Sequence, residues 1–383
     1  MPTYSARGLN LLDVAVMAPV IAASAVLSPV VDEALQALGA RAAPTTAVSD
    51  MTGAVVVVTG ANCGIGFRTA AWIAKMGATV VLACRDPARA EAARAALEAE
   101  RAAAALSSRF PHAAQGSFRV ELLDLASPRS VRAFAAALPA QVDVLVNNAG
   151  LNSGPDIFDV NYLGHFLLTQ LVLPALRRSA RGGRVVNLSS VMHHFAQSRA
   201  TPDYAQSVRG TYTAVQKRLL LDAQYADSKA AMVLLADEIN RREPDVEAFA
   251  VSPGAVASDI WRSTPAVLRK LFLDPTMALL FLTPDQGAAP SVHAATAPSP
   301  EGHFFQPYRM PWGAAASPWL TTACEFLGAF GGGANPMLVR RPRNAEAAAR
   351  DLWSLSDRLT RDVGGKDWSV IKRVLDDAVT ARG

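Results

Sequence analysis

Cysteine is scarce in this chain, and its placement excludes two classes of protein. Only Cys63, Cys84 and Cys324 occur among the 383 residues. Because their number is odd and their spacing is wide, they form neither a disulfide framework nor a CxxC metal-binding pair. A reducing, intracellular compartment is therefore expected.

Charge is also scarce, at 18% of the residues, and the net charge of +4 comes without a dense run of lysine or arginine. Such a mild basic excess does not indicate a nucleic-acid partner. Internal repeats of the solenoid type are absent from the sequence as well. Hydrophobic residues, by contrast, make up 51% of the chain. This fraction excludes a mainly disordered protein and is sufficient for a large core.

One long uncharged run lies near the start of the chain, at residues 14–31. Its length is close to the minimum for a membrane-spanning helix. Pro19, Pro29 and several alanines lower its hydrophobicity, however, and only Arg7 precedes it as an orientation signal. Three interpretations stay open, which are a membrane anchor, a surface helix, and a targeting segment that directs the chain to an organelle and is then removed.

The chain divides into a leader (residues 1–52), a long central domain (residues 53–307) and a partly helical C-terminal extension (residues 308–383). In the central domain short apolar runs alternate with amphipathic stretches. Strands buried on both faces have this continuous apolar character, so the alternation predicts an α/β fold with a doubly wound parallel sheet and helices on both faces. The expected strands are residues 54–59, 79–83, 118–122, 142–147, 184–188 and 247–251, with residues 303–305 as a last edge strand. The expected helices are residues 65–76, 87–105, 128–138, 160–177 and 225–242.

A glycine-rich turn, TGANCGIG at residues 59–66, follows the first expected strand and opens the first expected helix. Glycines allow a tight turn and a close approach of the backbone to a pyrophosphate. The first turn of the helix then offers unpaired N–H groups and a positive dipole end to that anion. The strand–turn–helix context makes this a specific signal for a dinucleotide. The expected cofactor-binding residues of the turn are Gly60, Asn62, Gly64, Ile65 and Gly66.

The GxxxGxG spacing of this turn and seven further motifs indicate a family. The motifs follow in order as TGANCGIG at 59–66, ACRD at 83–86, LLDL at 122–125, NNAG at 147–150, VNYLGHF at 160–166, VVNLSS at 185–190, YADSK at 225–229 and SPGAV at 252–256. Over residues 53–307 the chain resembles the short-chain dehydrogenase/reductase family, in the subgroup of the retinol dehydrogenases and WW-domain oxidoreductases. The resemblance implies a Rossmann-type sheet and a nicotinamide cofactor.

The end of the second expected strand bears on which cofactor is bound. An acidic residue there would bind the adenosine ribose and repel a 2′-phosphate. This chain has Cys84 at that place and Arg85 after it, and a guanidinium suits a phosphate. NADP(H) is therefore favoured over NAD(H), although Asp86 could pair with Arg85 and weaken the preference. The resemblance adds Asp124, Leu125 and Asn148 on the adenosine side.

Tyr225 and Lys229 are the central catalytic candidates. They lie one helical turn apart at the start of an expected helix and so share a face. An ammonium near a phenol stabilises the phenolate, so we expect Lys229 to lower the pKa of Tyr225 and let it act as general acid and base. By resemblance, Lys229 also holds the nicotinamide ribose.

Two further residues complete the expected catalytic set. Ser190 ends the fifth expected strand, where its hydroxyl can stabilise charge on a substrate oxygen. Ser190 is chosen over Ser189 because the family uses the second serine of such a pair and because alternating side chains point to opposite faces. Asn161 matches the helix asparagine that positions a lysine-linked water in the family. The resemblance also assigns the nicotinamide end to Pro253, Gly254, Val256 and Ser258.

Departures from the family pattern border the expected substrate cleft. The stretch 151–159 is shorter than usual, and residues 195–224 form an insertion between Ser190 and Tyr225. The adjacent His193 and His194 have no third ligand at a suitable spacing, so no metal site is expected.

These observations lead to an enzyme that transfers hydride between NADP(H) and a small lipophilic alcohol or carbonyl compound. Two alternatives remain. One is a protochlorophyllide-reductase-like enzyme, because YADSK resembles the YxDSK form of that family. The other is a non-catalytic NADP(H)-sensing scaffold. Membrane contact through residues 14–31 and assembly into a homo-oligomer are compatible with each of them.

Overall fold

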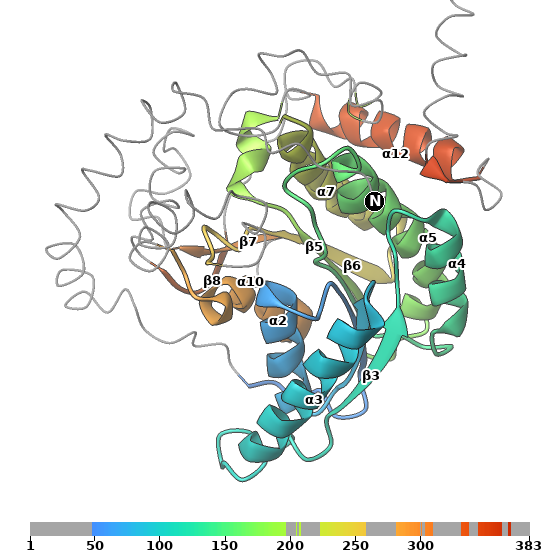
Figure 1. Cartoon of the computed structure of the whole chain (residues 1–383). Coiled ribbons are helices and arrows are strands. Elements are labelled where there is room, and N and C mark those ends of the chain that lie inside the picture. Colours follow the sequence, from blue (N-terminus) through green and yellow to red (C-terminus); the bar gives the residue numbers. More distant parts are fainter. Residues whose placement is uncertain are drawn as a thin grey trace, which may run out of the picture.

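Parallel strands and helices alternate along the chain in the order that the sequence predicts (Figure 1). The computed structural model describes residues 48–196, 204, 207, 223–257, 281–298, 300, 303–308, 331–336, 344–361 and 367–368. The uncharged run 14–31, most of the insertion 195–224 and Ser258 lie outside these residues. The strands are β1 (Val55–Thr59), β2 (Thr79–Cys84), β3 (Ser117–Leu122), β4 (Val144–Asn147), β5 (Gly183–Leu188), β6 (Val246–Val251), β7 (Phe304–Tyr308) and β8 (Gly331–Pro336).

The sheet has the order β3-β2-β1-β4-β5-β6-β7-β8. All pairs from β3 to β7 are parallel, and β8 runs antiparallel to β7. The order reverses its direction between β1 and β4, which is where doubly wound sheets form a crevice at the carboxyl ends of their strands. The predicted doubly wound α/β fold is confirmed.

Two layers of helices cover the sheet (Figure 1). One layer packs α2 (Gly64–Lys75), α3 (Pro87–Ala104) and α10 (Pro284–Thr296) on one face. The other layer packs α4 (Pro128–Ala137), α5 (Gly164–Leu176), α7 (Ala223–Arg242) and α12 (Ala345–Arg361) on the opposite face. The central strands lie between the two apolar clusters, which is why their sequences are apolar throughout.

Several helix starts follow from local sequence. Asp86 accepts a hydrogen bond from the backbone N–H of Arg89 and so caps α3, which begins with Pro87. Ser127 caps α4 in the same way, ahead of Pro128. An oxygen-bearing cap followed by proline satisfies the unpaired N–H groups that begin a helix.

Two sequence expectations need correction. The expected helix at 160–177 is interrupted, because a π-helical turn (η1, Asp159–Leu163) precedes α5. The expected edge strand, residues 303–305, corresponds to β7, but it is not at the edge of the sheet because β8 pairs with it. Both β8 and α12 lie beyond residue 307, so the extension contributes to the same sheet and to the same helix layer as the central domain.

Candidate active site

A cavity of about 370 Å³ opens at the carboxyl ends of β1, β2, β4, β5 and β6. Residues from all eight sequence motifs line this cavity together. Among the residues expected from the sequence, those that line the cavity are Gly60, Asn62, Gly64, Ile65, Gly66, Arg85, Asp124, Leu125, Asn148, Ser190, Tyr225, Lys229, Pro253, Gly254 and Val256. Asn161 is buried behind this lining, and Ser258 lies outside the described residues.

The glycine turn forms the floor of one end of the cavity. Gly60 and Gly64 have positive φ angles of 66° and 57°, which favour glycine. A Cβ added to Gly66 would lie 2.4 Å from Asn148 Nδ2 and 2.5 Å from the carbonyl oxygen of Gly60. Asn148 Nδ2 donates to the carbonyl of Thr59 at 2.7 Å, which ties the NNAG turn to the glycine turn. Only glycine therefore allows this close packing at position 66.

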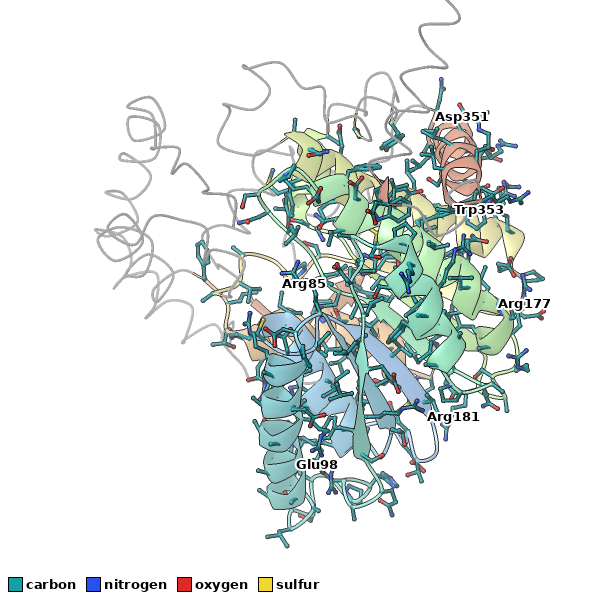
Figure 2. All side chains as sticks on the ribbon, turned by 45° about the vertical axis from the view of Figure 1, so that its right-hand side comes forward. Arg85, Glu98, Arg177, Arg181, Asp351 and Trp353 are labelled. Carbon is teal, nitrogen blue, oxygen red and sulfur yellow. The ribbon has the colours of Figure 1, made fainter. Side chains whose placement is uncertain are left out.

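The end of β2 carries the residues that bear on cofactor choice. Burial raises the pKa of the Cys84 thiol to about 11, so this side chain is neutral. Asp86 is engaged as the cap of α3. Arg85 and Arg89 both line the cavity. Figure 2 shows Arg85 at the opposite end of the strands from Arg181. Sequence analysis missed Arg89, although a second arginine in the first turn of the following helix was a visible signal.

The loop after β3, the strand paired with β2, forms a further part of the cavity wall. Its residues Leu123, Asp124 and Leu125 line the cavity. The loop is held locally, because the backbone N–H of Asp124 donates to Ser130 Oγ at 2.9 Å and the N–H of Ala126 donates to Asp124 Oδ1 at 3.0 Å. These bonds hold the backbone around Asp124 in one conformation.

Tyr225 and Ser190 both line the other end of the cavity, where the Ser190 hydroxyl favours the ionised form of Tyr225 and so acts to lower its pKa. Ser189, the preceding serine, is buried and donates through Oγ to the carbonyl of Lys229 at 2.8 Å. Alternation along the end of β5 thus sends one serine toward Tyr225 and the other into α7.

The pKa of Tyr225 is raised, whereas the sequence pattern predicted it to be lowered. Burial raises its pKa to about 12, and the Ser190 hydroxyl opposes this rise. The Lys229 Nζ donates to the carbonyl of Leu188 at 2.8 Å and lies 5.6 Å from the centroid of the Tyr225 ring. Burial also lowers the pKa of Lys229, to about 8. The removal of both groups from water outweighs their mutual attraction here.

Asn161, in the π-helical turn, joins the NNAG region to the catalytic helix. Its Oδ1 accepts from the N–H of Leu151 at 2.7 Å, and its Nδ2 donates to the carbonyl of Leu151 at 2.9 Å and to Ser228 Oγ at 3.0 Å. A Cβ added to Gly150 would lie 3.4 Å from Asn161 Oδ1 and 3.6 Å from Lys229 Nζ. The side chains of Asn161 and Lys229 are therefore gathered around Gly150.

His165 is a buried polar residue that sequence analysis did not assign. Its Nδ1 lies 3.0 Å from the carbonyl oxygen of Asn161, which can only accept, so Nδ1 carries the proton. Its Nε2 then accepts from Thr59 Oγ1 at 2.9 Å. Thr59 Oγ1 in turn accepts the backbone N–H groups of Asn148 and Ala149. Burial keeps the imidazole neutral by lowering its pKa to about 4.

Neither metal binding nor membrane crossing has support among the described residues. No group of three or more His, Cys, Asp or Glu side chains in the described ranges could hold a metal ion. His193 instead places Nδ1 2.6 Å from the carbonyl oxygen of Ser190. Of the helices in the described part of the chain, none has both the length and the apolar character needed to cross a bilayer.

Comparison with known proteins places this geometry in context. The model of the family described as short chain dehydrogenase matches residues 54–212. Retinol dehydrogenase 12 of Mus musculus is 35% identical over 302 residues, or 72% of this chain and 87% of that protein. Polyprenol dehydrogenase of Mus musculus is 37% identical over 273 residues, or 65% of this chain and 73% of that protein. A crystal structure of an uncharacterised Mycobacterium paratuberculosis protein is 28% identical, covers 84% of this chain and 97% of its own, and has a TM-score of 0.55.

Proposed function

Because this chain belongs to the short-chain dehydrogenase/reductase family, we propose that it is an NADP(H)-dependent oxidoreductase acting on lipophilic alcohols and carbonyl compounds. Its relatives mark it as a retinol dehydrogenase-like oxidoreductase, and the family binds a nicotinamide cofactor. The observation that carries the proposal is that Tyr225, Ser190 and Lys229 line the same cavity as the glycine turn.

The residues around the cavity fit a dinucleotide. Gly60, Asn62 and Gly64 line the cavity where α2 begins, and the unpaired N–H groups of a first helical turn can bind a pyrophosphate there. We assign the pyrophosphate to Gly60, Asn62, Gly64, Ile65 and Gly66, and the adenosine end to Arg85, Asp124, Leu125 and Asn148. The nicotinamide end is assigned to Tyr225, Lys229, Pro253, Gly254, Val256 and Ser258.

The bound cofactor supplies or accepts the hydride, and the side chains handle the proton. Tyr225 gives its hydroxyl proton to the substrate oxygen in reduction and takes it back in oxidation. A phenol whose pKa is about 12 keeps its proton until negative charge develops on that oxygen. Ser190 stabilises the same developing charge with its hydroxyl. Asn161 is a positioning residue, because it does not itself line the cavity and instead holds Leu151, which does, and Ser228 on α7.

NADP(H) is preferred in this proposal because two guanidinium groups, Arg85 and Arg89, line the adenosine end. The carboxylate of Asp86, which the sequence offered as a competitor for Arg85, accepts from the start of α3 instead. An arginine fork matches the geometry of a phosphate, so the pair suits the 2′-phosphate that distinguishes NADP(H) from NAD(H).

A lipophilic substrate is supported by the side chains near the catalytic tyrosine. Val160, Val191, Met192 and Val256 line the cavity on that side. Apolar walls with few polar groups are typical of sites for apolar ligands. The names of the relatives, retinol dehydrogenase and polyprenol dehydrogenase, also refer to lipid alcohols.

The test measures NADPH oxidation with retinaldehyde, long-chain aldehydes and small polar aldehydes, and repeats each assay with NADH. We expect turnover with NADPH and the lipophilic aldehydes. Tyr225→Phe should lower kcat at least about a hundredfold while NADPH still binds, because only proton transfer is lost.

If NADPH binds to the wild type and no carbonyl compound is reduced, the enzyme proposal fails. A pull-down that NADPH alters equally in the wild type and in Tyr225→Phe would then favour an NADP(H)-sensing scaffold. Light-dependent reduction of protochlorophyllide would favour the alternative that YADSK raises.

Membrane association is proposed to depend on the uncharged run 14–31. The test compares the full chain with a variant lacking residues 1–35 in membrane fractionation. Loss of the protein from the membrane fraction on deletion supports the proposal, and an unchanged distribution contradicts it.

A further inference from the structure

The C-terminal segment (residues 344–361 and 367–368) packs across the helix layer that carries the catalytic residues. Helix α12 lies along the outer side of α7 and α5 (Figure 1). Trp353 turns inward, with its ring edge against Phe166 at a centroid distance of 5.2 Å and the Arg242 guanidinium 4.6 Å from its ring centroid. Asp351, on the same helix, is exposed and points away (Figure 2).

Two hydrogen bonds connect this segment with the elements that form the site. Ser356, fully buried, donates to Tyr162 Oη at 3.1 Å, and Tyr162 follows Asn161 in the π-helical turn. The indole Nε1 of Trp368 donates to the carbonyl oxygen of Leu125 at 3.0 Å. Trp368 is 3% exposed, so this bond is shielded from water.

The hydrogen bond from Trp368 holds a residue of the cavity wall, Leu125. Leu125 lies at the end of the β3 loop and lines the cavity with Asp124. Its carbonyl oxygen points into the interior, since a Cβ added to Gly164 would lie 2.5 Å from it. Ser130 and Asp124 hold this loop locally, and the N–H of Leu123 donates to the carbonyl of Cys84 on β2 at 2.9 Å. At Leu125 itself the bond comes from Trp368, across 243 positions of sequence.

We propose that Trp368 is a positioning residue for the adenosine half of the cofactor, so that the C-terminal segment forms part of the dinucleotide site. The indole N–H fixes the Leu125 carbonyl and with it the wall that Asp124 and Leu125 present. This inference rests on the proposed function, which assigns those two residues to the adenosine end.

The test uses the full-length protein and Trp368→Phe, which keeps an aromatic ring and removes the N–H donor. Dissociation constants are measured by titration calorimetry for NADPH and for 2′,5′-ADP, which carries only the adenosine half. We expect both to bind about fivefold more weakly, the effect of losing one buried hydrogen bond. The kcat at saturating NADPH stays at the wild-type value, because the nicotinamide end is unchanged.

The matched control is Trp353→Phe, the same substitution on the same segment at a tryptophan that packs against α5 and not against the cavity wall. It should lower the melting temperature without changing either dissociation constant. If Trp368→Phe binds both probes as the wild type does, or if both variants weaken binding equally, the inference is wrong while the proposed function stands. A wild type that binds neither NADPH nor NADH overturns the proposed function and this inference together.

Discussion

Arg89 and His165 illustrate how single residues acquire a role that their sequence position does not show. Arg89 is one of several arginines on α3, yet it lines the cavity together with Arg85. His165 lies in an apolar helix, yet its two ring nitrogens join the end of β1 to the carbonyl of Asn161. Each of these roles is open to a direct test.

The two arginines should determine the preference between cofactors. Replacing both in an Arg85→Ala/Arg89→Ala variant removes the charge-assisted bonds that a 2′-phosphate would receive. We expect NADPH affinity to fall at least about tenfold while NADH affinity changes little. Arg181→Ala, at the opposite end of the strands (Figure 2), is the control. An unchanged ratio of the two dissociation constants in the double variant would contradict the assignment.

His165 should make stability depend on pH below neutrality. Burial lowers its pKa from 6.5 to about 4 in the folded chain, so between these values the unfolded chain binds more protons. The free energy of unfolding is therefore not reduced by His165 above pH 6.5. As the pH falls toward 4, protonation of His165 in the unfolded chain lowers this free energy by about 3 kcal/mol in all. Urea unfolding across this range should show a steeper loss for the wild type than for His165→Gln. Parallel curves would show that His165 titrates normally.

At the scale of elements, polar side chains hold α7 in register against β5. Asn187 Nδ2 donates to the carbonyl of Met232 at 3.2 Å, and Ser189 Oγ donates to the carbonyl of Lys229 at 2.8 Å. These bonds are buried in an otherwise apolar interface, where van der Waals packing alone permits sliding. They align Tyr225 with Ser190, because both belong to the elements that the bonds connect.

Removing one of these bonds should affect catalysis more than stability. We expect Ser189→Ala to lower the free energy of unfolding by about 1 kcal/mol and kcat at least about tenfold, since small displacements of reacting groups are costly. Thr296→Val is the matched control, because Thr296 Oγ1 makes a buried bond to the carbonyl of Val292 on α10, away from the site. It should lose similar stability and keep its kcat. A Ser189→Ala enzyme of wild-type kcat would refute the register argument.

At the scale of the whole molecule, described residues of the C-terminal extension (residues 308–383) form part of the hydrophobic core. Ala348, Leu352, Trp353, Leu359 and Trp368 belong to the apolar cluster that α4, α5 and α7 form on one face of the sheet. Strand β8 covers the edge of β7. The folded unit therefore includes residues on both sides of position 307.

A chain that ends at residue 343 should not fold stably. Each large buried side chain removed contributes about 1.5–3 kcal/mol, and four of them together rival the 5–15 kcal/mol that holds a typical domain. We expect thermal unfolding of the truncated chain, followed by circular dichroism, to lack a cooperative transition at 25 °C or above. A cooperative transition near the wild-type temperature would mean that α12 contributes little.

The sequence by itself determined the alternation of strands and helices, the glycine-rich turn and most of the residues that line the cavity. Continuous apolar runs indicated strands because both faces of each strand are buried. Helices expected to begin at Pro87 and Pro128 do begin there, and each has a local cap, Asp86 or Ser127. Six of the eight motifs marked the ends of strands, and a parallel sheet brings such ends to one edge.

Only the tertiary structure decided what depends on segments far apart in the chain. The strand β7 gained a neighbour, β8, from beyond a long intervening segment. Tyr225 acquired a raised pKa because several elements together exclude water from it, whereas spacing along a helix indicated only that Lys229 was near. Trp368 reached Leu125 across the molecule. Local sequence specifies turns, caps and faces, but desolvation and long-range contacts depend on how all the elements pack together.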